Sequence, residues 1–167
     1  MAILKITRRR VFTRKDNSFR LLTPREICCL LEKEYGVVEW KPRYDPVSEL
    51  VVTILSQHTS DINSGRAFEQ LMRTFGSLHS VASADVALIE RSIKMGGLAR
   101  IKAPRIKNIL NRILELRGNL DLNFLNQLSL QDAKDWLKSL PGIGPKSAAV
   151  ILCFSFGMPC PSSRHPK

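Results

Sequence analysis

The chain has 167 residues, of which 44% are hydrophobic, and its 26 Lys and Arg against 15 Asp and Glu give a net charge of +11. This apolar fraction suits one domain with its own core. No apolar run is long enough to span a membrane, and we expect no secretory signal, because the N-terminal basic residues are not followed by an apolar stretch and a small-residue cleavage site. The strong positive charge favours a polyanionic partner over a merely soluble basic protein.

Most of the positive charge lies in two clusters. Residues 1–20 hold seven basic residues and one acidic residue, a net charge of +6, and residues 91–117 hold eight and one, a net charge of +7. We expect residues 1–22 to form a basic arm that either touches phosphate or is simply solvated. The second cluster lies on predicted folded structure, where we expect a phosphate-binding basic patch of Arg100, Lys102, Arg105 and Lys107.

Helical patterns dominate the chain, and alternation typical of strands is hard to find. Thr23-Pro24-Arg25-Glu26 is a capping box with proline at the first helical position, and Gly36 ends the predicted helix. Asp45-Pro46 begins a second helix. Ser60 caps a third, which Gly76 closes.

Four further helices follow in the second half of the chain. We predict one from Ser83 to about Gly96, one over 104–117, one starting at Ser129 and one over 145–156. The helix over 104–117 carries an apolar stripe at helical spacing, formed by Ile106, Ile109, Leu110, Ile113 and Leu114. Seven amphipathic helices with short turns predict an all-α helical bundle.

The segment Leu140–Ala148, with the sequence LPGIGPKSA, is typical of a tight turn between two helices. Glycines let backbone amides point outward, and a helix N-terminus attracts anions. We therefore predict a site for the DNA backbone formed by Gly142, Ile143, Gly144, Lys146 and Ser147. Two roles fit Lys146 on this motif: a phosphate-binding lysine or a nucleophile.

This segment resembles the helix-hairpin-helix of the endonuclease III-type DNA glycosylases, the HhH-GPD superfamily, with the pattern L-P-G-[VI]-G-x-K-[ST]-A. Three other segments match family patterns in the right order: LSQHTSD at 55–61, GLARIKA at 97–103 and FGMP at 156–159. The resemblance runs from about Thr23 to Pro159. We therefore expect a helical domain at 23–159, with the hairpin at about 129–156, between the basic arm and a divergent tail at 160–167.

The resemblance implies a DNA glycosylase with abasic-site (AP) lyase activity in base excision repair. Lys146 matches the family nucleophile, which attacks the sugar C1′, expels the base and forms a Schiff base. Gln57 matches the residue that fills the hole left by a flipped base, and Leu98 matches the wedge. The implied partner is double-stranded DNA with damaged or abasic sites. We expect a monomer in the cytoplasm, near the nucleoid in a bacterium or archaeon, or in the nucleus of a eukaryote.

The sequence departs from the family after FGMP. There the family continues with V-D-T-H, whose Asp is catalytic, whereas here no Asp or Glu follows Asp135. The family's later iron–sulfur cysteines are also absent, and we interpret the spacing of Cys153 and Cys160 as coincidence. We therefore expect a C-terminally truncated or frame-changed member with impaired base excision, no 4Fe–4S cluster and no other metal, apart from a possible monovalent cation at the hairpin carbonyls.

Two other functions stay open at this point. The chain could be a helix-hairpin-helix module that binds DNA without chemistry, or a remnant that folds poorly. Because the family packs the helix at about 24–35 against C-terminal helices, we expect that helix to expose apolar surface here, and the fold to be marginal. Cys28 and Cys29 on the same helix are expected to be core or half-buried thiols.

Overall fold

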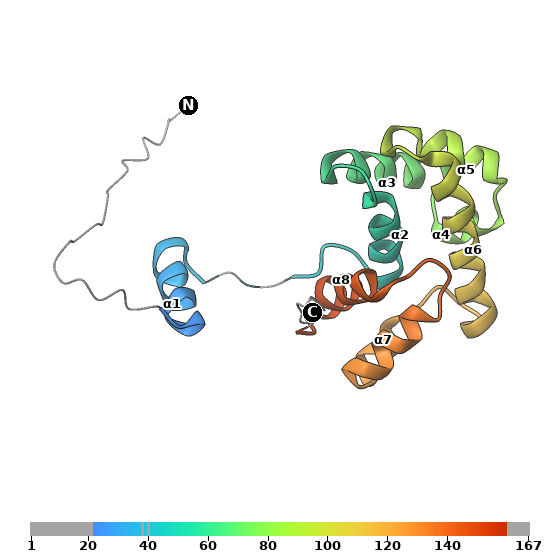
Figure 1. The fold of residues 1–167 in the computed structure, drawn as a ribbon. Helices are drawn as coiled ribbons and strands as arrows, with labels where there is room; N and C mark the ends of the chain where they lie inside the picture. Colours follow the sequence, from blue (N-terminus) through green and yellow to red (C-terminus); the bar gives the residue numbers. More distant parts are fainter. Residues whose placement is uncertain (1–21, 38, 40, 160–167) are drawn as a thin grey trace, which may run out of the picture. The chain divides into compact units, whose positions relative to one another are not determined.

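The computed structural model describes residues 22–37, 39 and 41–159. Those residues form eight α-helices and two short 3-10 helices, with no strand among them, so the predicted all-α class is confirmed (Figure 1). The chain divides into two units between Glu39 and Trp40, whereas the family resemblance predicts one domain over 23–159. Residues 1–21 of the expected arm and the whole tail at 160–167 lie outside the described residues.

The first unit holds α1 (Pro24–Tyr35), which begins at the predicted capping box. The Thr23 hydroxyl accepts from the Glu26 amide, and Glu26 accepts from the Thr23 amide at 2.9 Å. No residue of α1 is buried, and Ile27, Leu30 and Leu31 are 44–54% exposed, which confirms the expected apolar surface. The expectation for Cys28 and Cys29 is wrong, because both residues are exposed.

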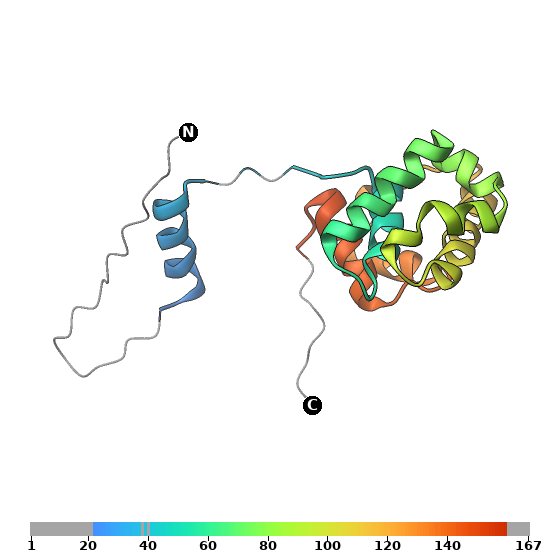
Figure 2. The ribbon, with the colours of Figure 1, turned by 90° about the horizontal axis from the view of Figure 1, so that it is seen from above.

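The second unit is built around α2 (Pro46–Ser56), in which every residue from Pro46 to Leu55 is buried. This helix packs against α3 (Asp61–Phe75), α6 (Ala99–Arg117) and α8 (Pro145–Phe156), as the view from above shows (Figure 2). Both α2 and α3 begin at the predicted caps, Asp45 and Ser60. The core of the described residues is aliphatic, with side chains such as Leu50, Ile54, Ile106, Ile109 and Ile151 fully buried.

The single helix predicted from Ser83 is wrong. The chain instead forms α4 (Leu78–Ser83), α5 (Val86–Ser92) and the 3-10 helix η1 (Lys94–Gly96). Ser77 and Asp85 cap α4 and α5, whereas Ser83 ends α4 and donates its hydroxyl hydrogen to the carbonyl of His79. A serine followed by Ala84 and Asp85 offers two competing caps, and the carboxylate takes the role.

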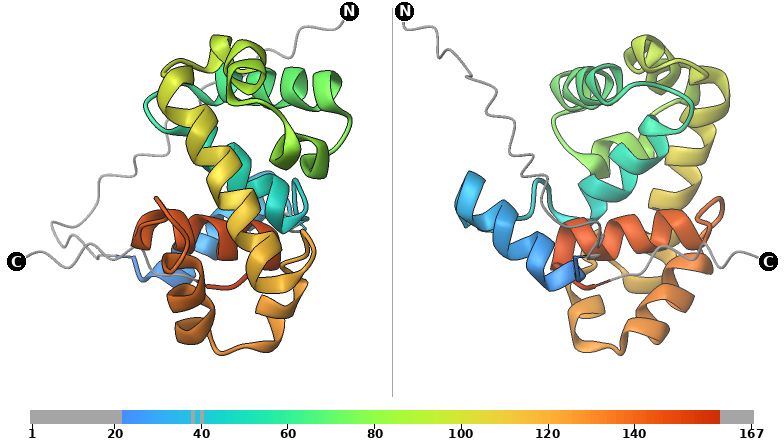
Figure 3. Two further views of the ribbon diagram at one scale, coloured as in Figure 1. Left: turned by 90° about the vertical axis from the view of Figure 1, so that its right-hand side faces the viewer. Right: turned by 60° about the vertical axis from the view of Figure 1, so that its left-hand side comes forward.

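Helix α6 begins at Ala99, earlier than the predicted Pro104. Pro104 has no backbone N–H and so removes one hydrogen bond from the second turn of α6, but the helix continues through it. The 3-10 helix η2 (Asn123–Gln127), α7 (Leu130–Lys138) and α8 follow, the last two at the predicted positions. Helix α6 packs on α4 and α5 and runs toward the α7–α8 hairpin (Figure 3). No helix in the described part of the chain has the length and apolarity to cross a membrane.

Candidate nucleic-acid interface

The hairpin turn lies between Ser139, which ends α7, and Gly144, which caps α8. Gly142 has φ +80°, a left-handed conformation that a side chain would strain. Helices α7 and α8 pack on each other, with Leu137, Leu140 and Ala148 buried beneath the turn. The turn itself stays at the surface, with Gly142 and Gly144 exposed.

The N-terminus of α8 carries backbone donors that the helix does not use. Gly144 has no side chain to cap the helix, and the first backbone bond runs from the Ala148 amide to the Gly144 carbonyl at 3.0 Å. The amides of Lys146 and Ser147 therefore have no intrahelical acceptor. The amides of Gly142 and Gly144 also form no hydrogen bond within the described residues. Four main-chain donors thus surround the turn, and the helix dipole adds positive potential there.

The backbone amide of Ile143 is not available to a phosphate, contrary to the prediction. Its N–H donates to the carbonyl of Leu140 at 3.2 Å, and its side chain is only 5% exposed. The residue therefore closes the turn and anchors it in the core. Buried apolar side chains at a turn fix its shape, so Ile143 contributes to the site by holding the glycines in place.

Lys146 is exposed in the first turn of α8, and no ion pair engages its ammonium group among the described residues. The nearby acidic side chains of α7 are used elsewhere. Asp132 accepts from the Ser129 hydroxyl at 2.6 Å, as part of the N-terminal cap. Asp135 accepts from Lys138 and Gln131, both at 2.8 Å, and these hydrogen bonds, that from Lys138 foremost, lower its pKa. Both carboxylates are therefore engaged within α7 or its N-terminal cap.

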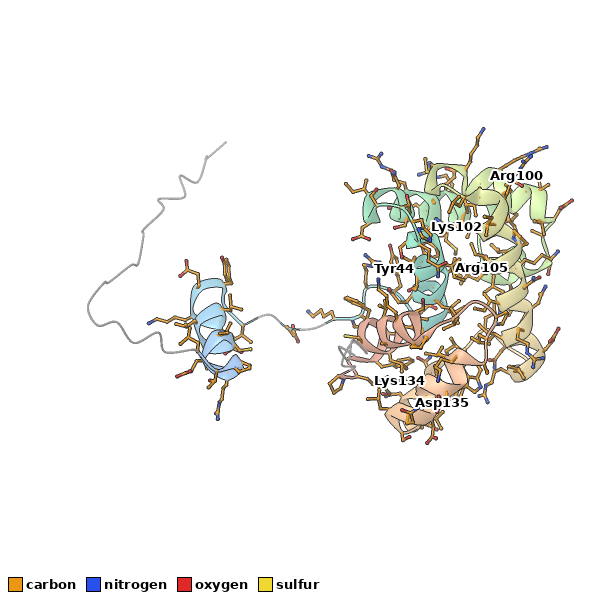
Figure 4. All side chains as sticks on the ribbon, in the orientation of Figure 1. Tyr44, Arg100, Lys102, Arg105, Lys134 and Asp135 are labelled. Carbon is orange, nitrogen blue, oxygen red and sulfur yellow. The ribbon has the colours of Figure 1, made fainter. Side chains whose placement is uncertain are left out.

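Gln57 ends α2 and is linked to α6 through Arg105. The Arg105 guanidinium donates to the Gln57 amide oxygen at 2.7 Å. The aliphatic part of Arg105 also lies against the turn, because a Cβ on Gly142 would come within 3.0 Å of the Arg105 Cδ. Figure 4 shows Arg105 near the middle of the second unit, with Arg100 at its upper end and Lys134 on α7 below. The Arg105 side chain therefore contacts both Gln57 and the hairpin turn.

The predicted basic patch does not form one exposed surface. Lys102 is only 2% exposed and donates to the carbonyls of Leu55 and Gly96, so its assignment to the patch is wrong. Burial lowers the pKa of its ammonium group. Lys102 stands four residues before Ile106, on the same buried face of α6. This spacing predicts a buried position for Lys102, which a count of charged residues does not reveal.

The other three patch residues differ in exposure. Lys107 is half-buried and donates to the Ala84 carbonyl at 2.7 Å, and Arg105 is half-buried on Gln57. Arg100 is the most open, with a loose contact of 3.6 Å to Glu90. Exposed ion pairs of this kind contribute little, so Arg100 is free to meet a phosphate.

Leu98, the predicted wedge, has an unusual backbone. It lies in the left-handed region at φ 51° and ψ 33°, directly before α6, and its side chain is 50% exposed. A leucine in this conformation costs about 1–2 kcal/mol, which the surrounding structure must offset. Its carbonyl accepts from the amides of Ile101 and Lys102, which fixes the residue at the start of the helix. Met95 and Ile101 are also exposed beside it in the sequence.

Comparison with known proteins matches residues 51–150 to the HhH-GPD superfamily base excision DNA repair proteins. The chain is 44% identical over 106 residues to an Arabidopsis thaliana protein named a putative DNA glycosylase, covering 64% of this chain and 36% of that protein. It is 35% identical over 109 residues to endonuclease III of Sulfolobus acidocaldarius, covering 64% and 46% of the two chains. For endonuclease III of Thermotoga maritima the identity is 31% over 115 residues, covering 69% and 50%.

The chain therefore spans half or less of the length of these three relatives. Among solved structures, a non-covalent endonuclease III–DNA complex superposes with a TM-score of 0.61 at 23% identity, covering 82% of this chain and 62% of that one. This likeness concerns the fold. The match over 51–150 includes Gln57, Leu98 and the hairpin up to Val150, so the described interface lies within the family region. The chain belongs to the HhH-GPD superfamily of base excision DNA repair proteins.

Proposed function

We propose that this chain acts on damaged or abasic duplex DNA as a glycosylase with AP lyase activity. The observation that carries the proposal is the exposed Lys146 in the first turn of α8, beside the unpaired amides of Gly142 and Gly144. The amides and the helix dipole bind a backbone phosphate. The same turn then presents an amine to the sugar of the bound strand.

The chemistry proposed for Lys146 follows from its neutral amine. The nitrogen lone pair attacks C1′, the bond from C1′ to the base breaks, and the base leaves with that electron pair and takes up a proton. Loss of a proton from nitrogen and opening of the sugar ring give a Schiff base. Abstraction of a C2′ proton then expels the 3′ phosphate by β-elimination, and water releases the lysine.

Expulsion of an intact base needs help that an abasic substrate does not need. A carboxylate that stabilises charge on the sugar usually supplies it. Asp132 and Asp135 are engaged in α7, and the sequence has no Asp or Glu at the positions after Pro159 where the family places its catalytic Asp. We therefore propose that this chain cleaves abasic DNA more efficiently than it removes a base.

Borohydride trapping tests this proposal with two duplexes, one holding an abasic site and one an oxidised pyrimidine. We expect a covalent complex with wild-type protein on the abasic duplex and none with Lys146→Gln. The matched control is Lys134→Gln, which removes the same charge from α7 (Figure 4). Equal trapping by Lys146→Gln and wild type would refute the role of this lysine.

A DNA-binding module without chemistry is the alternative, and the engagement of both α7 carboxylates favours it. In that case the wild-type protein would bind both duplexes in a salt-dependent manner and trap neither. Gel shifts at two salt concentrations, run on the trapping samples, separate the two functions.

We further propose that the turn holds a monovalent cation. The carbonyls of Pro141, Gly142 and Ile143 accept no hydrogen bond within the described residues, which leaves three oxygen ligands at the turn. A bound cation would add positive charge next to the phosphate. Replacing K⁺ with a bulky organic cation at constant ionic strength is expected to weaken DNA binding, and equal affinity in both salts would contradict the site.

A further inference from the structure

Arg105 joins two parts of the interface that are far apart in the sequence. Its Nη1 donates to the Oε1 of Gln57, 48 positions away, at 2.7 Å. Its Cδ and Nε lie 3.0 and 3.1 Å from where a Cβ on Gly142 would stand. Contact with the turn fixes the direction of the side chain, and the hydrogen bond then fixes the amide of Gln57.

We infer that Arg105 is a positioning residue that makes Gln57 present only its NH₂ group to DNA. The inference rests on the proposed function, in which Gln57 enters the helix at a flipped nucleotide. A guanidinium has donors and no acceptor, so the Gln57 group that faces it must be the oxygen. The Gln57 NH₂ group makes no hydrogen bond within the described residues and points away from Arg105.

A fixed donor on Gln57 discriminates between the bases that can stand opposite the flipped nucleotide. The ring nitrogen at the centre of the Watson–Crick edge is an acceptor in cytosine and adenine and an N–H donor in thymine and guanine. Directed at this central nitrogen, the donor end of Gln57 favours cytosine over thymine and adenine over guanine, because the carbonyl oxygens of thymine and guanine flank that position and are reached only by a shift of the amide. Each comparison keeps ring size constant, so stacking and fit change little. One hydrogen bond gained corresponds to about a five-fold difference in affinity.

Binding to four duplexes tests this preference without requiring catalysis. Each duplex holds a tetrahydrofuran abasic analogue opposite cytosine, thymine, adenine or guanine, and fluorescence anisotropy gives the dissociation constants. For the wild-type protein we expect ratios of about five for cytosine over thymine and for adenine over guanine. For Arg105→Met, whose released Gln57 amide can rotate, we expect both ratios to fall below about two.

Two further variants sharpen the test. Arg112→Met removes the same charge from an exposed position of α6 that pairs with Glu115 at 3.0 Å, and we expect it to keep the wild-type ratios. Gln57→Glu keeps Arg105 intact but presents an oxygen to DNA, so both ratios should invert even if Arg105→Met unfolds. Arg105→Lys, which can still donate to Gln57, should restore part of the preference.

The outcomes separate this inference from the proposed function. Wild-type binding with equal affinity for all four duplexes, or unchanged ratios in Arg105→Met, would overturn the role of Arg105 and leave the proposed function standing. A wild-type protein that binds none of the duplexes overturns both. Side-chain ¹⁵N relaxation gives a readout without DNA: the Gln57 NH₂ group should be rigid in the wild type and mobile in Arg105→Met, and equal mobility would contradict the inference.

Discussion

The ammonium group of Lys102 lies 2.6 Å from the carbonyl oxygen of Leu55 and 2.8 Å from that of Gly96. Both carbonyls stand at helix ends, where the last turn leaves them without an amide donor. Lys102 therefore ties the ends of α2 and η1 to the first turn of α6. This link holds in place the two segments that carry Gln57 and Leu98.

We expect Lys102→Met to lower the free energy of unfolding by about 2–4 kcal/mol, since it leaves two buried carbonyls unpaired. Urea denaturation followed by circular dichroism measures the change. Lys138→Met is the control, because it removes only an exposed ion pair with Asp135 and should cost less than about 1 kcal/mol. Similar losses in the two variants would show that the buried contacts contribute little.

The stability conferred by Lys102 should also depend on pH. Burial lowers its pKa in the folded protein below the ordinary value of 10.5. Between the lowered pKa and 10.5 the unfolded chain holds more protons than the folded one, so the free energy of unfolding rises with pH in this window. The stability difference between wild type and Lys102→Met should therefore grow from pH 8 to pH 10. A difference that shrinks over this range would contradict the lowered pKa.

The sequence predicted those features that depend on neighbouring residues. The caps of α2, α3 and α7, the start of α8 and the surface turn at Gly142 and Gly144 follow from short patterns, and the structure has them where expected. The burial of Lys102 was also readable, because it shares a face with Ile106. A count of charges along the chain does not show which helix face each charged residue lies on.

Other features could not be predicted, because they arise from contacts between distant segments. The bond of Arg105 to Gln57 depends on how α6 packs beside α2, and no local pattern encodes it. The left-handed conformation of Leu98 breaks a local preference, and its carbonyl accepts the hydrogen bonds that begin α6. Such departures from local preference are where functional constraints are expected.

Glu49 on α2 is a buried carboxylic acid, 3% exposed, whose Oε2 has no partner in the described residues. Burial raises its pKa, and Arg43, 4.0 Å away, opposes this only in part. Above pH 4.5 the unfolded chain loses this proton while the folded protein keeps it, so the free energy of unfolding falls as pH rises from 4.5 to the raised pKa. Glu49→Gln should therefore raise the melting temperature at pH 7 more than at pH 4.5, and an equal change at both would refute this.

The two glycines of the turn should respond differently to substitution by alanine. At Gly142 the positive φ of +80° and the close Arg105 stem both oppose a Cβ, so we expect a loss of about 1–2 kcal/mol and weaker DNA binding. At Gly144 nothing lies within 4 Å of the added Cβ and φ is −92°, so the fold should tolerate alanine. Thermal melts of both variants check this contrast, which equal melting temperatures would contradict.

Leu98→Asn should separate stability from function. Asparagine accepts the left-handed region more readily than leucine, and the replaced side chain is already 50% exposed, so the melting temperature should stay the same or rise. The apolar wedge is lost, however, and with it the contact that replaces stacking in a distorted duplex. Affinity for an abasic duplex should fall by more than affinity for an intact duplex of the same sequence. Ile62→Asn, which changes an exposed apolar side chain on α3, is the control and should alter both affinities equally. An equal loss on both duplexes for Leu98→Asn would show that this residue contacts DNA in general and does not act as a wedge.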